Sequence, residues 1–216
     1  WLSFHVWDGI SPMRWVGAEN YSRLLFDDIW WKAVYNTIWL FFAATVPQLL
    51  LALLLAFIIN MPSLRGKDFF RAAYFMPIVA SAVAVSLIFG SLFGQRYGIL
   101  NYVLGFVGLG PIDWLGSAKW LKPSIAIVTI WQWTGYSMIL FLAGLQSINQ
   151  ELYEAARVDG ARTRHIFRHI TLPLLRPVIL FQVILSIIGA MQNFDVPVML
   201  AGGTQSSAPG GTDRAG

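Results

Sequence analysis

Four long apolar runs constrain this chain more than any other feature of its sequence. They cover about 33–59, 72–93, 124–145 and 172–200. Each is long enough to span a membrane, because roughly 20 apolar residues cross the hydrocarbon layer as a helix. Buried helices of soluble proteins are usually shorter and have a polar face. The sequence therefore predicts an all-α, polytopic membrane helix bundle with four transmembrane helices.

The composition also indicates a membrane protein. Hydrophobic residues make up 56% of the 216 residues and charged residues only 12%, whereas about 25% of residues are charged in soluble domains. The mean hydropathy is +0.60. A net charge of +4 would suit a nucleic-acid partner, but the basic residues lie in the loops between the apolar runs. The positive-inside rule accounts for that distribution, so no nucleic-acid partner is expected.

The distribution of Lys and Arg predicts the orientation of the spans. Loops 60–71 and 146–176 together carry eight of the 15 basic residues and four acidic ones, so their net charge is +4. Because cytoplasmic loops are enriched in Lys and Arg, we expect these two loops inside and 1–32, 94–123 and 201–216 outside. Four tryptophans fall at the expected outer interface, where aromatic side chains concentrate: Trp30, Trp31, Trp114 and Trp120.

The polar stretch between the third and fourth runs has the pattern of a short helix. Residues 148–159 are expected to form it, with Ser147 or Asn149 as the cap and two glutamates in the early turns, where the helix dipole favours anions. Two alanines on one face would let another backbone approach closely. The residues spaced to share that face are Leu152, Ala155, Ala156 and Asp159.

A second helix is expected after this one. Gly160 suits the left-handed position that ends a helix. The next helix would run from Ala161 towards Ile170, and Leu172-Pro173 would then turn the chain into the fourth run, since proline is tolerated in a first helical turn.

From Glu154 to Pro173 this stretch reads EAARVDGARTRHIFRHITLP. Glu-Ala-Ala, Gly160 and an Ile-x-Leu-Pro ending stand at fixed distances within it. The pattern resembles the EAA loop of ABC-transporter permeases, the cytoplasmic loop that docks onto the ATPase subunit. The resemblance implies a coupling loop at about 147–171, in which these residues carry the coupling to the ATPase: Glu154, Ala155, Ala156, Arg157, Asp159 and Gly160.

The resemblance extends over nearly the whole chain up to about Gly203. The runs VGAENY, RGKDFFRAAYFMP, GILN, WLG and FLAGLQSINQELYEAARVDGA look like the sugar-type branch of these permeases, as in maltose and glycerol-3-phosphate uptake. This implies an all-α, MetI-like permease core with a short cytoplasmic coupling helix, in the plasma (inner) membrane of a bacterium or archaeon. It also implies import of a carbohydrate or related polyol by alternating access. The implied partners are ABC ATPase subunits, a second permease subunit and an extracytoplasmic solute-binding protein.

Members of the family usually have one more span before the region of Trp1 and another after the region of Gly203. We therefore expect a permease domain at 1–203 that is truncated at both ends, followed by a disordered Gly/Ser-rich tail at 204–216. Three alternatives stay open. One is a permease of the same architecture for another solute, such as an amino acid, ion or peptide. The second is an intramembrane enzyme, and the third is a non-functional fragment.

The sequence offers no convincing catalytic set or metal site. The nucleotide-binding pattern G-x-x-x-x-G-K-[ST] is absent, because Gly66-Lys67 is followed by Asp68. ATP and Mg²⁺ are therefore expected in the partner ATPase, with no cofactor in this chain. His165 and His169 share a helix face but lack the H-E-x-x-H pattern of zinc proteases, so we interpret them as ordinary polar residues. An intramembrane enzyme would need paired catalytic groups at matching depth, and none is found.

Polar residues inside the apolar runs are candidates for the solute path, because such residues usually face a cavity or a neighbouring helix. Amide and hydroxyl groups suit a neutral polyol since they both donate and accept hydrogen bonds, and Trp131 and Trp133 could stack on a sugar ring. Hydrogen bonding between helices is an equally good explanation. Asn36, Thr37 and Gln48 are assigned to packing. The path candidates are Gln132, Tyr136, Ser186, Gln192 and Asn193.

Overall fold

Helices account for almost all of the regular structure in the part of the chain that the computed structural model describes, which is residues 1–192, 196–197 and 199–200. The predicted all-α fold is confirmed. The chain divides into two units, Trp1–Trp39 and Leu40–Gly216. The tail expected at 204–216 and part of the fourth run lie outside the described residues.

The first unit contains a small hairpin followed by helices. The 3-10 turn η1 (Leu2–Phe4) leads into β1 (His5–Val6), which pairs antiparallel with β2 (Arg14–Trp15). Helices α1 (Glu19–Leu25) and α2 (Asp28–Leu40) come next. The sequence patterns did not predict this hairpin, because each of its strands is only two residues long.

Hydrogen bonds from α1 hold the start of the hairpin. The side-chain amide of Asn20 donates to the carbonyl oxygens of Ser3 (2.9 Å) and His5 (3.1 Å), and the Tyr21 hydroxyl donates to Ser3 Oγ (2.7 Å). Asn20 and Tyr21 are the last two residues of the VGAENY run, so that run has a structural role in this unit.

The hairpin turn is organised by the Asp8 carboxylate. It accepts hydrogen bonds from the backbone N–H of Ser11 (2.7 Å), from the Ser11 hydroxyl (2.7 Å) and from the backbone N–H of Ile10 (3.0 Å). These bonds, the one from the Ser11 backbone above all, lower the pKa of the Asp8 carboxyl from 3.8 to about 2, because they favour its charged form.

The first apolar run forms a helix long enough to cross a membrane. This helix covers Asp28–Asn60 and consists of α2, the π-helical turn η2 (Phe41–Thr45) and α3 (Val46–Asn60). Pro47 lies in the first turn of α3, where its missing N–H is tolerated. This helix contains the whole of the run predicted to span the membrane at about 33–59.

The second run, predicted as one span over about 72–93, is a pair of helices. α4 (Lys67–Val79) and α5 (Ala82–Leu92) meet at a bend of 99°, as in a broken span or a re-entrant loop. The Ser81 side chain accepts a hydrogen bond from the backbone N–H of Ala84 (3.2 Å), so it starts α5 as a new helix. The predicted span is therefore bent near Ser81, a feature that the hydropathy of the run does not reveal.

The third run lies within a long helix that starts earlier than expected. After α6 (Ile99–Phe106), α7 covers Ala118–Gln146, whereas the predicted span opened at residue 124. The Ser117 side chain accepts a hydrogen bond from the backbone N–H of Lys119 (3.3 Å) and caps α7. Pro123, expected in front of the helix, therefore lies inside it.

The fourth run continues a helix that begins in the preceding loop. α8 (Gln150–Val158) is followed by α9 (Thr163–Ile166), the π-helical turn η3 (Phe167–Thr171) and α10 (Leu172–Gln192). The last three form one helix, Thr163–Gln192. The turn expected at Leu172-Pro173 is wrong, because the Leu172 N–H bonds to the Phe167 carbonyl five residues back, and this π turn carries the helix past the proline.

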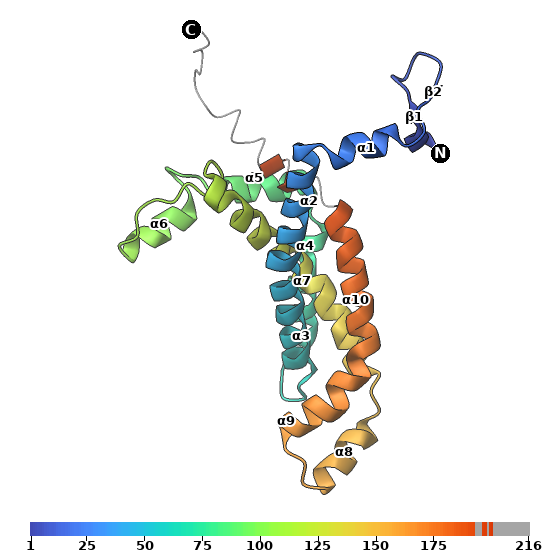
Figure 1. Cartoon of the computed structure of the whole chain (residues 1–216). Coiled ribbons are helices and arrows are strands. Elements are labelled where there is room, and N and C mark those ends of the chain that lie inside the picture. The colour runs from blue at the N-terminus through green and yellow to red at the C-terminus, as the bar shows by residue number, and fades with distance from the viewer. Residues whose placement is uncertain (193–195, 198, 201–216) are drawn as a thin grey trace. The chain divides into compact units, whose positions relative to one another are not determined.

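Within the second unit, α3, α4 and α10 pack around α7 (Figure 1). One buried cluster joins α3, α7 and α10 near α8; its members are Ala52, Ala56, Ile59, Met138, Phe141, Leu142, Leu145, Ile148 and Leu175. A second cluster joins α5 to the start of α7 at the opposite end; it includes Val85, Phe89, Phe93, Trp114, Ile125 and Val128. The loops predicted to be inside therefore meet at one end of this unit, and loop 94–123 lies at the other.

Two contacts explain how closely the helices approach α7. A Cβ atom at position 135 would collide with the Tyr74 carbonyl, so Gly135 lets α4 lie directly against α7. From α3, the Gln48 side chain donates to the carbonyl of Trp133 (3.0 Å) and to Ser137 Oγ (2.6 Å). The interpretation of Gln48 as a packing residue is confirmed.

Candidate functional site

The polar segment after α7 begins its short helix with a defined cap. Asn149, and not Ser147, occupies the cap position of α8, where its side-chain oxygen accepts a hydrogen bond from the Glu151 backbone N–H (3.0 Å). The Asn149 side-chain N–H group also donates to the Glu151 carboxylate (3.0 Å). This acidic residue lies in the first turn, where the helix dipole favours it.

The other end of α8 is closed by a glycine in the left-handed region. Gly160 has φ = +75°. Its N–H donates to the Arg157 carbonyl (3.0 Å), and the Ala161 N–H donates to the Ala156 carbonyl (2.9 Å). This pair of bonds is the Schellman motif, which satisfies the last carbonyls of a helix. The predicted helix-ending role of Gly160 is confirmed.

α8 is attached to the rest of the unit mainly through Tyr153, which the sequence analysis did not single out. Its ring packs against the buried cluster of α3, α7 and α10, and its hydroxyl lies 3.2 Å from Oγ1 of the buried Thr171. Its partner Thr171 is 18 residues away in the sequence, so the residues around Tyr153 carry no signal for this anchor. Tyr153 therefore links α8 directly to the long helix Thr163–Gln192.

The opposite side of α8 is open to contact. Leu152 and Val158 are 45% and 88% exposed, large values for apolar side chains. The residues predicted from spacing to share one face are not equally exposed in the structure, because Ala156 is half-buried on the side of Tyr153. The exposed candidate coupling residues are Glu154, Ala155, Arg157, Asp159 and Gly160. Val158 was missed because an apolar residue at the end of a short amphipathic helix usually points inward.

The basic helix that follows brings its two histidines into contact. The rings of His165 and His169 stack with centroids 3.9 Å apart, and His169 Nδ1 lies 3.1 Å from the His165 carbonyl oxygen. Ile166, on another face, is buried. Among the described residues, no three His, Cys, Asp or Glu side chains gather in a group that could hold a metal ion.

The candidate solute-path residues occupy two helices. Gln132 is buried on α7, and Tyr136, one turn further, lies edge-on to Trp133 (centroids 6.2 Å apart). On α10, Ser186 is half-buried and Gln192 is exposed at the last position. Asn193 lies outside the described residues. No hydrogen bond or ring contact in the described part of the chain joins the α7 candidates to those on α10.

Both tryptophans offered for stacking on a sugar ring have an aromatic neighbour in the protein. The Trp131 ring meets Phe89 of α5 edge-on, with centroids 5.0 Å apart. Trp133 is exposed. Trp131 is 42% exposed and Trp133 is 44% exposed, so exposure does not distinguish the two rings as sites for a ligand.

Two buried polar side chains were missed by the sequence analysis. Gln182 of α10 is 1% exposed, and its side-chain nitrogen has no hydrogen-bond partner within the described residues. The buried hydroxyl of Ser86 in α5 also lacks a hydrogen-bond partner there. Gln182 stands alone in the run VILFQVIL (178–185), which is itself a signal. A polar group inside a span normally finds its partner in a neighbouring helix or a cavity.

The far end of the unit is organised by one buried asparagine. The side-chain amide of Asn101 donates to the carbonyls of Gly94 (3.3 Å), Gln95 (3.1 Å) and Ile112 (2.8 Å). Its oxygen accepts from the Ile112 backbone N–H (3.0 Å) and from Trp114 Nε1 (2.9 Å). Asn101 ends the GILN run and Trp114 begins WLG, so these two runs fold against each other.

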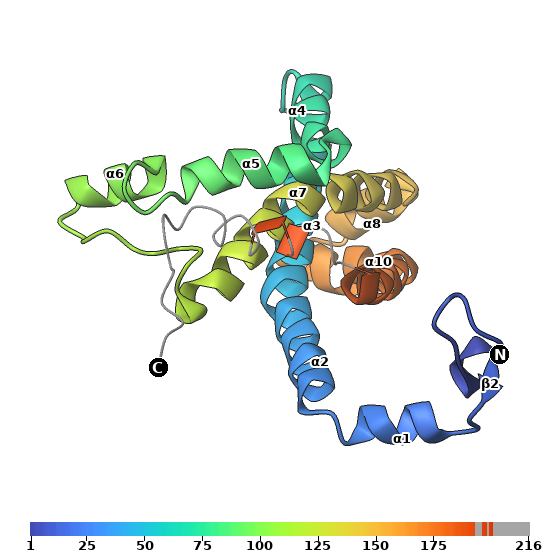
Figure 2. The same ribbon diagram turned by 90° about the horizontal axis from the view of Figure 1, so that it is seen from above.

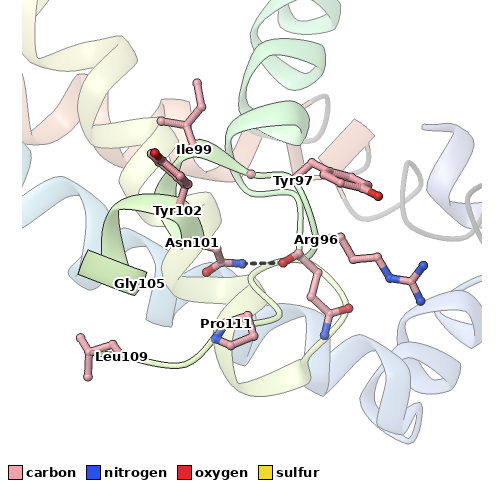
Figure 3. A pocket seen from close by; sticks show the side chains of 10 residues that line it. Arg96, Tyr97, Ile99, Asn101, Tyr102, Gly105, Leu109 and Pro111 are labelled. Carbon is pink, nitrogen blue, oxygen red and sulfur yellow. Dashed lines mark hydrogen bonds between the residues drawn. The ribbon is translucent and has the colours of Figure 1, made fainter. Parts of the chain in front are cut away.

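An open pocket of about 380 Å³ lies beside Asn101 (Figure 3). Arg96 and Tyr97 belong to its rim and point away from Asn101, as Figure 3 shows. The pocket is lined by Gln95, Arg96, Tyr97, Gly98, Ile99, Asn101, Tyr102, Gly105, Leu109 and Pro111. It lies in loop 94–123, at the end of the unit opposite α8.

Comparison with known proteins decides the family. Residues 30–211 match the family described as "Binding-protein-dependent transport system inner membrane component". The chain belongs to this family. Its members are transport permeases, and the apolar helices fit a multi-pass protein of the inner membrane.

Permeases with known names are similar along nearly the whole chain. The lactose transport system permease protein LacF of Rhizobium radiobacter is 41% identical over 210 residues, which are 96% of this chain and 70% of the relative. The trehalose/maltose transport system permease protein MalF of Thermococcus litoralis is 34% identical over 212 residues, covering 98% of this chain and 70% of the relative. The chain thus spans 70% of the length of both.

The fold also matches solved importers. A bacterial ABC transporter involved in the import of the acidic polysaccharide alginate aligns with a TM-score of 0.75 at 25% identity, covering 87% of this chain and 69% of that chain. The alginate transporter in complex with a pentasaccharide-bound periplasmic protein aligns with a TM-score of 0.72 at 24% identity. The helix arrangement described above is therefore that of an ABC-importer permease.

Proposed function

We propose that this chain is the membrane-spanning permease subunit of an ATP-binding-cassette importer for a carbohydrate or related polyol. The substrate class is supported by the relatives named for lactose and for trehalose and maltose transport. The similarity to an alginate importer points to the same class. Dependence on a solute-binding protein is part of the family description.

The observation that carries the coupling role is the exposed side of α8. This helix is capped at both ends and anchored by Tyr153, yet it presents Leu152, Ala155 and Val158 without cover. An apolar strip with a small residue in its middle fits a helix that docks into a groove of another protein. An ABC ATPase subunit is the partner that the proposed function requires there.

A displacement of α8 can reach the membrane-spanning helices through direct side-chain contact. Tyr153 contacts Thr171, and Thr171 belongs to the single helix Thr163–Gln192. A displacement of α8 by the ATPase would therefore move α10 as a rigid rod, and helices that pack in a dense core shift between discrete arrangements. Alternating access by this movement, with a second permease subunit completing the path, is the mechanism we propose.

The solute path is proposed to include Gln132 and Tyr136 of α7 and Ser186, Gln192 and Asn193 of α10. Gln182 joins this set because its buried amide lacks a partner within the described residues. Amide groups of this kind both donate and accept hydrogen bonds, which suits the hydroxyl groups of a sugar.

The test compares two glycines that end helices in the same way. Gly160 closes α8, and Gly108 closes α6 with φ = +74° and the same pair of bonds, from Gly108 to Gly105 and from Leu109 to Leu104 (both 3.1 Å). Proline cannot adopt a positive φ, so both substitutions strain the chain by about 1–3 kcal/mol. Only the first lies at the proposed docking helix.

Gly160→Pro is expected to reduce solute uptake by about tenfold or more, while the protein remains in the membrane at its normal level. Gly108→Pro is expected to retain most of the uptake. The measurement is uptake of labelled solute by cells or liposomes that contain the whole transporter. Wild-type uptake by Gly160→Pro would refute the coupling role of α8.

A further inference from the structure

The helix α6 has an apolar face that nothing in the described part of the chain covers. Residues 98–112 contain no charged side chain. Ile99 and Phe106 are 61% and 76% exposed, and Tyr102 and Val103 are exposed between them. The spacing of these four residues places them on one side of the helix.

The other side of α6 faces the protein. Asn101 is buried in its hydrogen-bond network, and Leu104 packs against the cluster that contains Phe93 and Trp114. These contacts fix the rotation of α6 about its own axis, so its apolar side points away from the unit. Seen from above, α6 extends sideways beyond α3, α7 and α10 (Figure 2).

The depth of α6 along the unit can be counted on α7. The Ser124 hydroxyl donates to the Trp114 carbonyl (2.9 Å), and Trp114 is bonded to Asn101 of α6. Ser124 and Gln146, at the end of α7, are 22 positions apart in the sequence, or about 33 Å along a helix. The hydrocarbon layer is about 30 Å thick, so α6 lies at the boundary opposite α8.

The chemistry around α6 fits a lipid headgroup region. Tyr97 and Tyr102 are exposed in this region, and aromatic side chains with a polar tip concentrate at membrane interfaces. Arg96 is exposed at the adjacent pocket rim and forms no ion pair with the described residues. A phosphate group of a phospholipid would neutralise it.

We propose that α6 is an interfacial helix whose apolar face, formed by Ile99, Tyr102, Val103 and Phe106, is embedded in the bilayer surface. A lipid surface is favoured over a protein partner by the depth of the helix, its sideways extension and the absence of charged groups that would fix a protein partner. The assignment to the outer leaflet rests on the proposed function, whereas the contact with lipid does not. The embedded helix would hold the α5–α7 connection in place while α10 moves.

The chain contains no cysteine, so single cysteines can be labelled without a background. Val103→Cys and Phe106→Cys would each carry a nitroxide spin label in the whole transporter reconstituted in phospholipid liposomes. Collision rates are then measured with oxygen, which concentrates in lipid, and with a water-soluble nickel chelate. Leu104→Cys on the inward side of the same helix and Lys119→Cys at the exposed start of α7 serve as controls.

Labels at 103 and 106 are expected to collide several times more often with oxygen than with the nickel chelate, whereas the label at 119 shows the reverse and the label at 104 is shielded from both. Free access of the nickel chelate to 103 and 106 would show that the helix lies in water and would overturn the proposal. Shielding of 103 and 106 from both reagents would also overturn it, because a protein partner would then cover the face. Uptake measured on the same samples reports separately on the proposed function.

Discussion

The helices α6 and α8 form an instructive pair. Both are short, both lie at an end of α7, and both close with a glycine at φ near +75° and the same two backbone bonds. They differ in what surrounds them. α6 has no charged residue and is held by a buried asparagine that makes five hydrogen bonds, whereas α8 carries two acids and an arginine and is held by one tyrosine.

The comparison shows that two helices with the same end geometry can have different roles. The role depends on how each helix is held and on which side chains it exposes. A helix pinned through buried hydrogen bonds cannot shift without leaving polar groups unpaired. A helix held by a single ring and one hydroxyl can transmit a movement with the long helix to which it is attached. We therefore assign α6 to anchoring and α8 to coupling.

The largest expected effect tests how each helix is held. Asn101→Ala leaves the N–H groups of Ile112 and Trp114 without their acceptor, and each such loss in a buried site costs about 1–3 kcal/mol, so about 2–6 kcal/mol in total. The matched change Asn149→Ala removes only the cap of α8 and is expected to cost about 1 kcal/mol. Thermal unfolding of the two variants in detergent provides the measurement. Equal losses of stability would contradict the proposed difference between α6 and α8.

A smaller effect is expected where α8 meets the long helix. Tyr153→Phe removes the hydroxyl contact with Thr171 but keeps the ring packing, so the expected loss of stability is about 1 kcal/mol. Uptake should fall more than this loss explains, because the movement of α8 is then less well transmitted. Tyr102→Phe on α6 is the control and should leave both stability and uptake unchanged; a similar effect of the two substitutions would argue against Tyr153 as the link.

The smallest effect concerns the exposed carboxylate of Asp8, which belongs to neither α6 nor α8. The pKa of Asp8 is lowered from 3.8 in the free group to about 2 in the folded hairpin. Its stabilising contribution is therefore fully present above pH 3.8 and is lost as the pH falls through about 2. Carboxyl NMR titration is expected to show this shift, which Ser11→Ala should reduce; a titration of wild-type Asp8 at its usual value would contradict the turn geometry.

Much of α8 could be predicted from the sequence because its signals are local. Asn149 supplies a side-chain acceptor at the start, and Gly160 supplies the positive φ at the end. The attachment through Tyr153 could not be predicted, since its partner Thr171 is 18 residues away and is brought close only by the tertiary fold.

The spans show the same division between local and non-local information. Hydropathy located all four runs, but it did not reveal the bend at Ser81, because one capping serine hardly changes the mean of an apolar window. Pro173 indicated that the chain turns before the fourth run. In the structure the π turn that precedes this proline lets the helix continue past it. The rotation of α6 was also out of reach, since it depends on the distant partners of Asn101.

The most direct test of the account is a cross-link from α8. Ala155→Cys, in a chain that has no other cysteine, would be treated with a short bifunctional thiol reagent in membranes that contain the whole transporter with single cysteines on the ATPase surface. We predict a cross-link to the ATPase subunit from Ala155→Cys and none from the control Val103→Cys on α6. Modification of Ala155→Cys by a membrane-impermeant reagent added from outside, with no cross-link to the ATPase, would contradict the account.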